Sequence, residues 1–179
     1  MNLWHELPPG PDVPQVVYVI VEIPKGSRNK YEYHKTAGVL KLDRVLYSSL
    51  HYPGDYGLIP RTYYEDGDPL DILVMINEPT FPGCIIEARP VGVFRMMDKG
   101  LPDDKILAVP ASDPLAQGYA DISDLPPHYL REVAHFFEVY KDLEGERTRP
   151  LGWEPAEVAR ERILHSINLY RTHFQPPRL

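Results

Sequence analysis

The stretch Glu-Asp-Gly-Asp-Pro-Leu-Asp at residues 65–71 runs directly into the apolar segment Ile-Leu-Val-Met-Ile at residues 72–76. The apolar segment is typical of a buried β-strand. The proline biases the preceding Asp68 toward an extended backbone, so Asp66 and Asp68 would project to the same side of the chain. Asp71 begins the strand, where a sheet would fix its direction. Such close carboxylates repel one another unless a cation holds them, and their oxygens suit Mg²⁺ or Mn²⁺, so the stretch predicts a metal site.

The composition is that of an ordinary soluble domain, with 43% apolar and 25% charged residues among 179. This length suffices for one sizeable core, and we expect a single domain over residues 1–179. The formal charge of −7 argues against a nucleic-acid partner, whose binding surface would normally be basic. The single cysteine excludes an internal disulfide and a Cys₄ zinc site. No segment has the length of a membrane span or the pattern of a signal peptide, so we expect a cytoplasmic protein without a membrane partner.

Most of the chain has the pattern of short strands. Besides residues 72–76, strand patterns cover residues 16–23, 30–34, 39–45, 85–97 and 105–109. Residues 52–57 read as a turn cluster, and residues 98–104 as an acidic loop.

Helical periodicity appears only late in the chain. Apolar residues recur at spacings of three and four over residues 127–140, and a second helix is predicted over about residues 155–172, with Pro155 near its first turn. Several short strands followed by two helices indicate an α+β domain built on a small antiparallel barrel.

Acidic groups recur near the predicted strand ends, together with cations and phenols. The acids are Glu22, Glu32, Asp66, Asp68, Asp71, Asp98, Asp103 and Asp104, and the others are Lys30, Arg44, Lys105, Lys141, Tyr52, Tyr56 and Tyr140. Carboxylates hold divalent metals, while cations and phenols hold phosphate oxygens, so this set favours phosphoryl transfer to water. Glu22 is informative because it lies inside an apolar strand, where a carboxylate is costly unless it is paired.

Three other kinds of protein share parts of this pattern. An EF-hand is excluded because Asp71 takes the sixth position, which needs Gly, and Asn77 takes the twelfth in place of Glu. An aspartyl-phosphate phosphatase would need an apolar strand before Asp66, and residues 62–65 (Thr-Tyr-Tyr-Glu) make a poor one. A non-catalytic OB-type module that binds anions or oligonucleotides remains the alternative function, although it predicts a basic face that the net acidity disfavours.

Residues 66–72 match Asp-x-Asp-Pro-hydrophobic-Asp-hydrophobic, the signature of the family I soluble inorganic pyrophosphatases. The chain resembles that family, in its prokaryotic form, along nearly its whole length. Further matching segments are Val-Glu-Ile-Pro (21–24), Asn-Lys-Tyr-Glu (29–32), Leu-Asp-Arg (42–44), Tyr-Pro-Gly-Asp-Tyr-Gly (52–57), Arg-Pro-Val-Gly (89–92), Asp-Asp-Lys (103–105), His-Phe-Phe-Glu-Val-Tyr-Lys (135–141) and Gly-Trp (152–153). A single signature could arise by chance, whereas a series of matching segments in the same order along the chain would rarely do so.

The resemblance implies a five-stranded OB-like antiparallel β-barrel with two C-terminal helices packed outside. It implies hydrolysis of inorganic pyrophosphate to two orthophosphates by metal-activated water, with several Mg²⁺ ions per active site and Mn²⁺ or other divalent metals as possible substitutes. It also implies a homo-oligomer, commonly a hexamer in prokaryotic members.

The resemblance further implies a role for each matching residue. The metal ligands would be Asp66, Asp71 and Asp103, with Asp98 and Glu32 serving ions that arrive with the substrate. Asp68 would be the general base, Glu22 would order metal-bound water, and Tyr56 would complete the catalytic group. The phosphates would be held by Lys30, Arg44, Tyr56, Lys105, Tyr140 and Lys141, and Tyr52 would line the site. The additional acid Asp104 leaves open which of two neighbours binds metal, and the Asp-x-Lys spacing favours Asp103.

Overall fold

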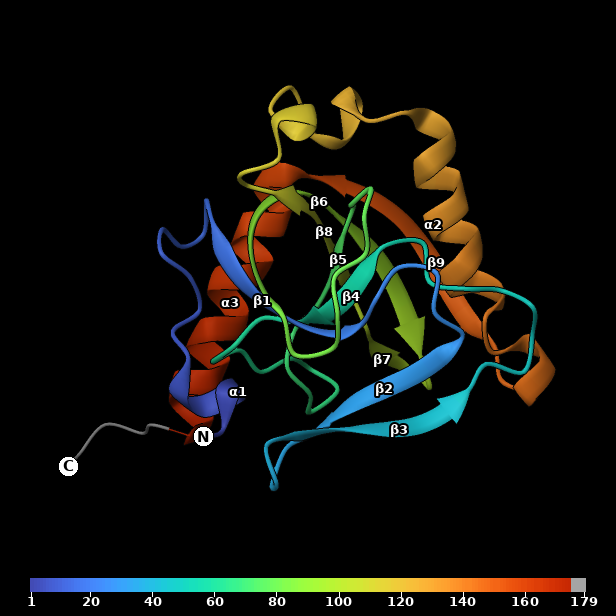
Figure 1. The fold of residues 1–179 in the computed structure, drawn as a ribbon, viewed down its shortest axis with the longest axis horizontal. Coiled ribbons are helices and arrows are strands. Elements are labelled where there is room, and N and C mark those ends of the chain that lie inside the picture. Colours follow the sequence, from blue (N-terminus) through green and yellow to red (C-terminus); the bar gives the residue numbers. More distant parts are fainter. Residues whose placement is uncertain (175–179) are drawn as a thin grey trace.

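The computed structural model describes residues 1–174 (Figure 1). Its helices and strands, in chain order, are α1 (Leu3–Glu6), β1 (Val17–Ile23), β2 (Asn29–His34), β3 (Val39–Val45), β4 (Asp55–Leu58), β5 (Asp71–Val74), β6 (Ile85–Asp98), β7 (Leu101–Pro102), β8 (Lys105–Pro110), α2 (Pro127–Val139), β9 (Thr148–Pro155) and α3 (Ala156–Phe174). Short 3₁₀ turns lie at Pro114–Ala116, Ile122–Asp124 and Asp142–Glu144.

The main sheet has seven strands in the order β1-β4-β5-β8-β6-β7, with β9 on the other edge of β6. Strand β1 also pairs with β6, so the pairings from β1 through β4, β5, β8 and β6 return to β1 and form a closed cycle. Strands β5 and β8 run parallel, with Asp71 opposite Lys105. Strands β2 and β3 form a separate hairpin.

The predicted five-stranded antiparallel barrel was wrong in strand number and strand direction. The sheet is seven-stranded and mixed, because β5 and β8 are parallel. Strand β9 was missed because Pro150, Gly152 and Pro155 break its pattern, and β4 was read as part of a turn. The prediction of a mixed α+β chain with two late helices is confirmed by α2 and α3.

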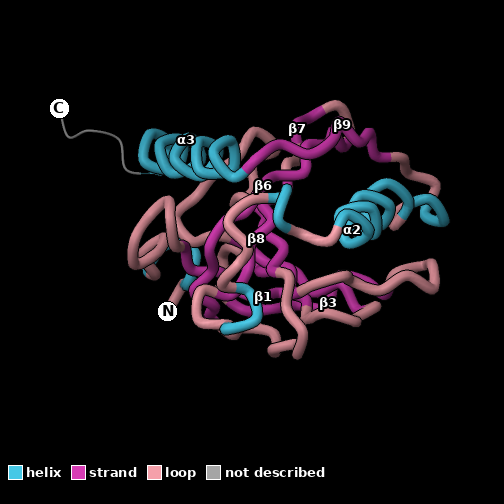
Figure 2. The backbone as a smooth tube through the Cα atoms, turned by 90° about the horizontal axis from the view of Figure 1, so that it is seen from above, coloured by secondary structure: helices cyan, strands magenta, loops and turns pink. Residues whose placement is uncertain are grey.

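Strand β5 shows how the core is divided. Side chains alternate along a strand, so Ile72 packs in a cluster that includes Ala159 and Ile163 of α3. Leu73 packs in a second cluster, which includes Phe137 of α2. Both faces of β5 are therefore buried, which explains its uninterrupted apolar sequence. Figure 2 shows α2 and α3 at separate places on the periphery of the strands.

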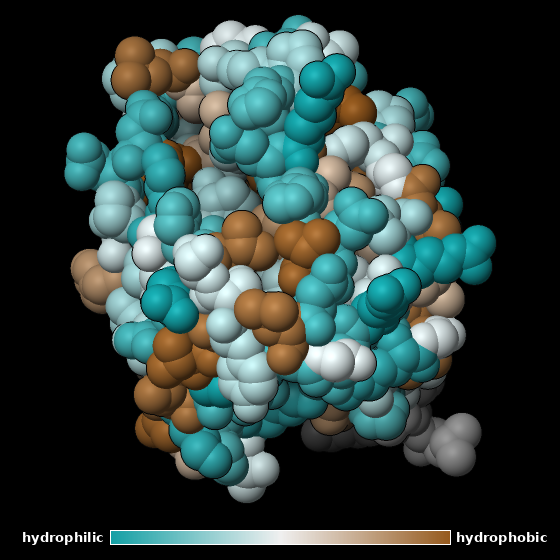
Figure 3. Space-filling view, turned by 90° about the vertical axis from the view of Figure 1, so that its right-hand side faces the viewer, coloured by the Kyte–Doolittle hydropathy of each residue, from teal (hydrophilic) through white to brown (hydrophobic). Residues whose placement is uncertain are grey.

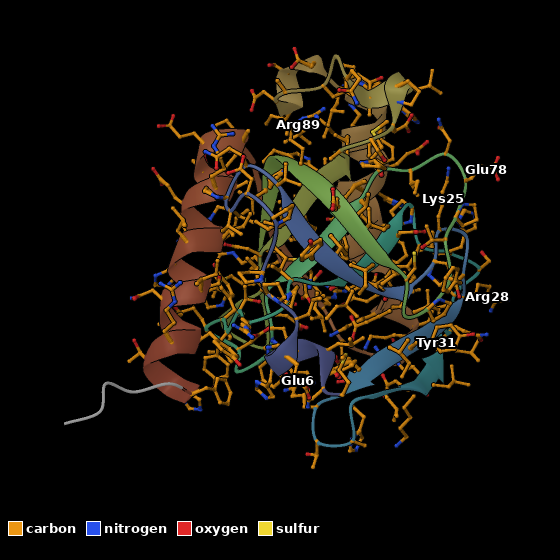
Figure 4. All side chains as sticks on the ribbon, turned by 60° about the vertical axis from the view of Figure 1, so that its left-hand side comes forward. Glu6, Lys25, Arg28, Tyr31, Glu78 and Arg89 are labelled. Atoms are coloured by element: carbon orange, nitrogen blue, oxygen red, sulfur yellow. The ribbon has the colours of Figure 1, made fainter. Side chains whose placement is uncertain are left out.

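The connection from β8 to α2 is fastened to β6 by one arginine. Arg89 donates hydrogen bonds to the carbonyl oxygens of Ala116 (2.8 Å) and Tyr119 (3.0 Å), and Figure 4 labels it beside this connection. On the face shown in Figure 3, small apolar patches are separated by hydrophilic side chains. Within residues 1–174, no helix combines the length and apolar character that crossing a membrane requires.

Candidate active site

A cavity of about 320 Å³ opens where the hairpin β2–β3 approaches the main sheet. Its walls come from β1, β2, β3, β4, β5, β6, β8 and the residues that follow α2. Of the fifteen residues singled out from the sequence, all but Asp104 line this one cavity: Glu22, Lys30, Glu32, Arg44, Tyr52, Tyr56, Asp66, Asp68, Asp71, Asp98, Asp103, Lys105, Tyr140 and Lys141. The fold therefore gathers side chains that span some 120 positions of the sequence.

Three aspartates form the acidic centre of the cavity. One carboxylate oxygen from each of Asp66, Asp71 and Asp103 lies within 4.8 Å of the other two. Asp71 begins β5 and Asp103 precedes β8, and the parallel pairing of these strands places the two residues side by side. Three hard oxygen donors fixed near strand ends suit Mg²⁺ or Mn²⁺. Asp98 and Glu32 line the cavity but are not part of this trio.

Lys105 is a buried cation at the base of the trio. Its Nζ donates to Asp71 Oδ2 (2.7 Å), Asp103 Oδ1 (2.8 Å) and the Tyr56 hydroxyl (2.9 Å). Burial alone would lower the pKa of Lys105, but the charges of Asp103 and Asp71 raise it well above its usual value. Lys105 therefore stays charged and partly neutralises the clustered acids.

The pKa values of the two acids that contact Lys105 are shifted in opposite directions. Burial raises the pKa of Asp71 well above its usual value. Burial would also raise the pKa of Asp103, but the charge and hydrogen bond of Lys105 lower it. Burial raises the pKa of Asp66 to about 6. In the absence of metal, burial therefore favours the neutral forms of Asp66 and Asp71, whereas Lys105 favours the ionised form of Asp103.

The structure separates the two acids between which the sequence left a choice. Asp103 lines the cavity, whereas Asp104 does not. The Asp104 carboxylate accepts a hydrogen bond from the Tyr64 hydroxyl (2.6 Å) and lies 3.8 Å from Arg162 Nε. Of these two neighbours, Asp103 is therefore the one whose carboxylate lies close to those of Asp66 and Asp71.

Glu22 joins the sheet to the hairpin. Its Oε1 accepts the backbone N–H of Tyr33 at 2.8 Å, so this buried carboxylate connects β1 to β2. Burial raises the pKa of Glu22 to about 7, although the Tyr33 hydrogen bond and the charge of Lys30 act in the opposite direction. Glu22 therefore has a structural partner in addition to its place in the cavity.

Asp68 has two close partners, Asp66 and Lys35, and the sequence pattern pointed only to the first. Its backbone N–H donates to Asp66 Oδ1 at 3.0 Å, and its carboxylate forms an ion pair with Lys35. Lys35 and Lys99 also line the cavity. Both lie at the ends of strands, in turns that carry no recognisable motif, so only the folded chain shows that they face the site.

The other cations in the cavity form ion pairs with acids. Lys141 contacts Asp98 at 2.6 Å, and Lys30 contacts Asp43 at 3.4 Å. Arg44 contacts Asp43 at 2.5 Å and also forms an ion pair with Glu144, which follows α2. These cations lie where they could bind an anionic ligand.

Two buried tyrosines add neutral hydrogen-bond donors. Tyr52 and Tyr56 are almost fully buried, and burial raises the pKa of each well above its usual value. Both phenols therefore remain protonated at neutral pH. The cavity thus combines metal-binding oxygens, cations and neutral donors, which is suited to a small polyanion with bound metal.

Comparison with known proteins identifies one family. The family model described as inorganic pyrophosphatase matches residues 19–171. The chain is 49% identical over 175 residues to the inorganic pyrophosphatase of Haloferax volcanii, covering 97% of this chain and 99% of that protein. It is 51% identical over 174 residues to that of Halobacterium salinarum, covering 97% and 98%. The crystal structure of inorganic pyrophosphatase from Thermus thermophilus superposes with a TM-score of 0.92 at 43% identity, covering 96% and 99%.

Proposed function

The chain belongs to the inorganic pyrophosphatase family and hydrolyses inorganic pyrophosphate, and we propose that the reaction takes place in the cavity around Asp66, Asp71 and Asp103. The observation that carries this proposal is the approach of these three carboxylates within 4.8 Å of one another. The oligonucleotide-binding alternative is not favoured, because seven carboxylates line the same cavity and would repel a nucleic-acid backbone.

The trio would hold Mg²⁺, with Mn²⁺ as a possible substitute, and its oxygen donors fit that role. Bound ions of this kind lower the pKa of water and neutralise charge on phosphoryl oxygens. Asp98 and Glu32 would provide further carboxylates when the substrate brings additional ions. Lys105 would keep the two strand-end ligands Asp71 and Asp103 oriented.

Asp68 would act as the general base by accepting the proton of the attacking water. Its backbone hydrogen bond to Asp66 fixes it beside the trio, and Lys35 pairs with its carboxylate. A general base must lie within hydrogen-bonding distance of the water that it deprotonates, and a place beside the trio would bring Asp68 close to a water bound to the metal. Glu22 would orient a water from the β1 side of the cavity.

The cations and phenols would hold the two phosphates. Lys and Arg side chains stabilise the charge that develops on the departing phosphate, and preorganised phenol donors add hydrogen bonds without reorganisation. The residues assigned this role are Lys30, Arg44, Tyr56, Lys105, Tyr140 and Lys141, while Tyr52 supports Tyr56 through ring contact at 5.4 Å between centroids.

We also propose that residues 1–179 act as a single domain and assemble into a homo-oligomer, a hexamer by family resemblance, in the cytoplasm. Exposed apolar side chains on β3 support an assembly, since Val39, Leu42 and Val45 are each about half exposed. Light scattering of the purified protein would measure the mass, and a monomer at micromolar concentration would contradict this assignment.

The first test is orthophosphate release from pyrophosphate, measured with Mg²⁺ and with EDTA, together with calorimetric Mn²⁺ binding. Asp68→Asn should keep metal affinity but lower turnover by about 10²- to 10⁴-fold, the usual contribution of a general base. Asp71→Asn should weaken metal binding as well, because it removes a ligand.

Glu157→Gln on the exposed surface of α3 serves as the matched control and should leave both readouts unchanged. Equal metal affinity in Asp68→Asn and Asp71→Asn would contradict the assigned roles. Release that survives in Asp68→Asn would keep the reaction but move the base to another residue.

A further inference from the structure

The neighbouring acids Asp103 and Asp104, which directly precede β8, have different surroundings. Asp103 faces the cavity, while Asp104 is 3% exposed and does not line it. A buried carboxylate is costly unless it is hydrogen-bonded and paired. The burial of Asp104 so close to the acidic trio therefore requires an explanation that the hydrolysis mechanism does not supply.

The Asp104 carboxylate has partners in two distant segments. Its Oδ2 accepts a hydrogen bond from the hydroxyl of Tyr64 at 2.6 Å. Arg162 of α3 places its Nε 3.8 Å from the same oxygen and supplies a compensating charge. A short hydrogen bond from a hydroxyl to a carboxylate, away from water, is among the stronger polar contacts in proteins.

Tyr64 stands at the base of the turn that carries Asp66 and Asp68. Its backbone N–H donates to the carbonyl of Asp68 at 2.8 Å, and its carbonyl accepts the N–H of Gly67 at 3.0 Å. Its ring is 4% exposed and packs in the core cluster that includes Ile163 of α3. The position of Tyr64 therefore sets the position of the whole turn.

We propose that Tyr64 and Asp104 are positioning residues that set the spacing between Asp66 and Asp103. Their hydrogen bond ties the turn between β4 and β5 to the start of β8, the two segments that supply these carboxylates. Metal sites need their ligands held within about 0.5 Å, and a turn needs an anchor to meet that demand. This inference rests on the proposed metal site and adds a second layer of residues to it.

The test uses Tyr64→Phe, which removes one hydroxyl and keeps the buried ring. We expect the affinity of the full-length protein for Mn²⁺, measured by calorimetry without substrate, to fall by about 10-fold, as is usual for residues that orient metal ligands. The Mg²⁺ concentration needed for half-maximal hydrolysis should rise equally, while turnover at saturating Mg²⁺ should change much less.

Glu65→Gln is the matched control, because Glu65 also joins this turn to α3, through an exposed contact with His165 at 3.2 Å. It should leave Mn²⁺ affinity unchanged. The double variant Tyr64→Phe with Asp104→Asn should lose little more affinity than the larger single effect, since both changes break the same hydrogen bond.

The outcomes separate this inference from the proposed function. A lower melting temperature with unchanged Mn²⁺ affinity in Tyr64→Phe would overturn the inference and leave a purely structural contact. If the wild-type protein itself bound no divalent metal, the proposed metal site would be contradicted. This outcome is distinct from a failure of the inference, because it is measured on the wild type without either variant.

Discussion

Glu22 combines a structural contact with a place in the cavity of the proposed active site. Its carboxylate accepts the Tyr33 N–H and lines the cavity, so it holds the hairpin against the sheet at the point where the substrate would bind. This placement has an electrostatic cost, because burial raises the pKa of Glu22 from the usual 4.5 to about 7. Such a shift links the protonation of Glu22 to the stability of the fold.

This linkage predicts a pH dependence for the metal-free protein. The folded pKa lies above the unfolded one, so the folded state binds the proton more tightly. The stabilisation is complete below the unfolded pKa and is lost as the pH rises through about 7. The loss amounts to about 3 kcal/mol, taking 1.36 kcal/mol per pKa unit. Glu22→Gln should remove this component, so urea unfolding in EDTA at pH 5 and pH 8 should show a smaller decrease than in wild type.

Glu157→Gln should keep the wild-type decrease, because Glu157 is exposed on α3. An equal decrease in wild type and Glu22→Gln would show that other groups in the cavity account for the pH dependence.

Most residues of the site could be identified from the sequence, but the directions in which their side chains point could not. Asp66, Asp68 and Asp71 were predictable because they stand together before a strand. The opposite directions of Asp103 and Asp104 depend on what packs beside each of them, since Asp104 contacts Tyr64 and Arg162 from other segments. Lys35 was missed for the same reason, because its partner Asp68 lies more than thirty positions away.

At the scale of elements, the success of a strand prediction followed the local composition. Residues 39–45 were predicted as the strand that β3 forms, and the predicted strand at residues 85–97 differs from β6 by one residue. Strand β4 has the sequence Asp-Tyr-Gly-Leu, in which Asp and Gly disfavour a strand. It forms nonetheless, because pairing with β1 on one side and β5 on the other outweighs the local preference.

Gly57, one of the residues that make β4 hard to predict from the sequence, is required by the packing of β4 against β1. A Cβ at position 57 would overlap the carbonyl oxygen of Ile20 in β1. Gly57→Ala should therefore push β4 away from β1 and lower the free energy of unfolding by about 2–3 kcal/mol, the usual cost of overpacking. Chemical denaturation would measure the change. Gly118→Ala is the control, because a Cβ there meets no atom within 4 Å; equal stability of both variants would contradict the close approach.

At the scale of the whole molecule, the closed cycle of paired strands brings the site together. Strands β1, β4, β5, β8 and β6 each place at least one side chain in the cavity, and the cycle holds them in fixed relation. The sequence could not predict this cycle, since its parallel step from β5 to β8 spans about thirty residues that include β6. The strand pattern and the family resemblance both led to an antiparallel barrel, which lacks this parallel step.

Convergence of three carboxylates means that a bound metal should stabilise the entire fold. A ligand that binds only the folded state stabilises it by RT ln(1 + [L]/Kd), which is about 2.7 kcal/mol at a hundred times Kd. For a protein of this size, that corresponds to a rise in melting temperature of about 5–10 °C. We expect calorimetry to show this rise when Mg²⁺ is added to EDTA-treated protein.

NaCl at equal ionic strength should produce a much smaller rise, because screening does not replace a ligated cation. Asp71→Asn should lose most of the Mg²⁺ effect, and an undiminished rise in that variant would place the stabilising ion away from the trio.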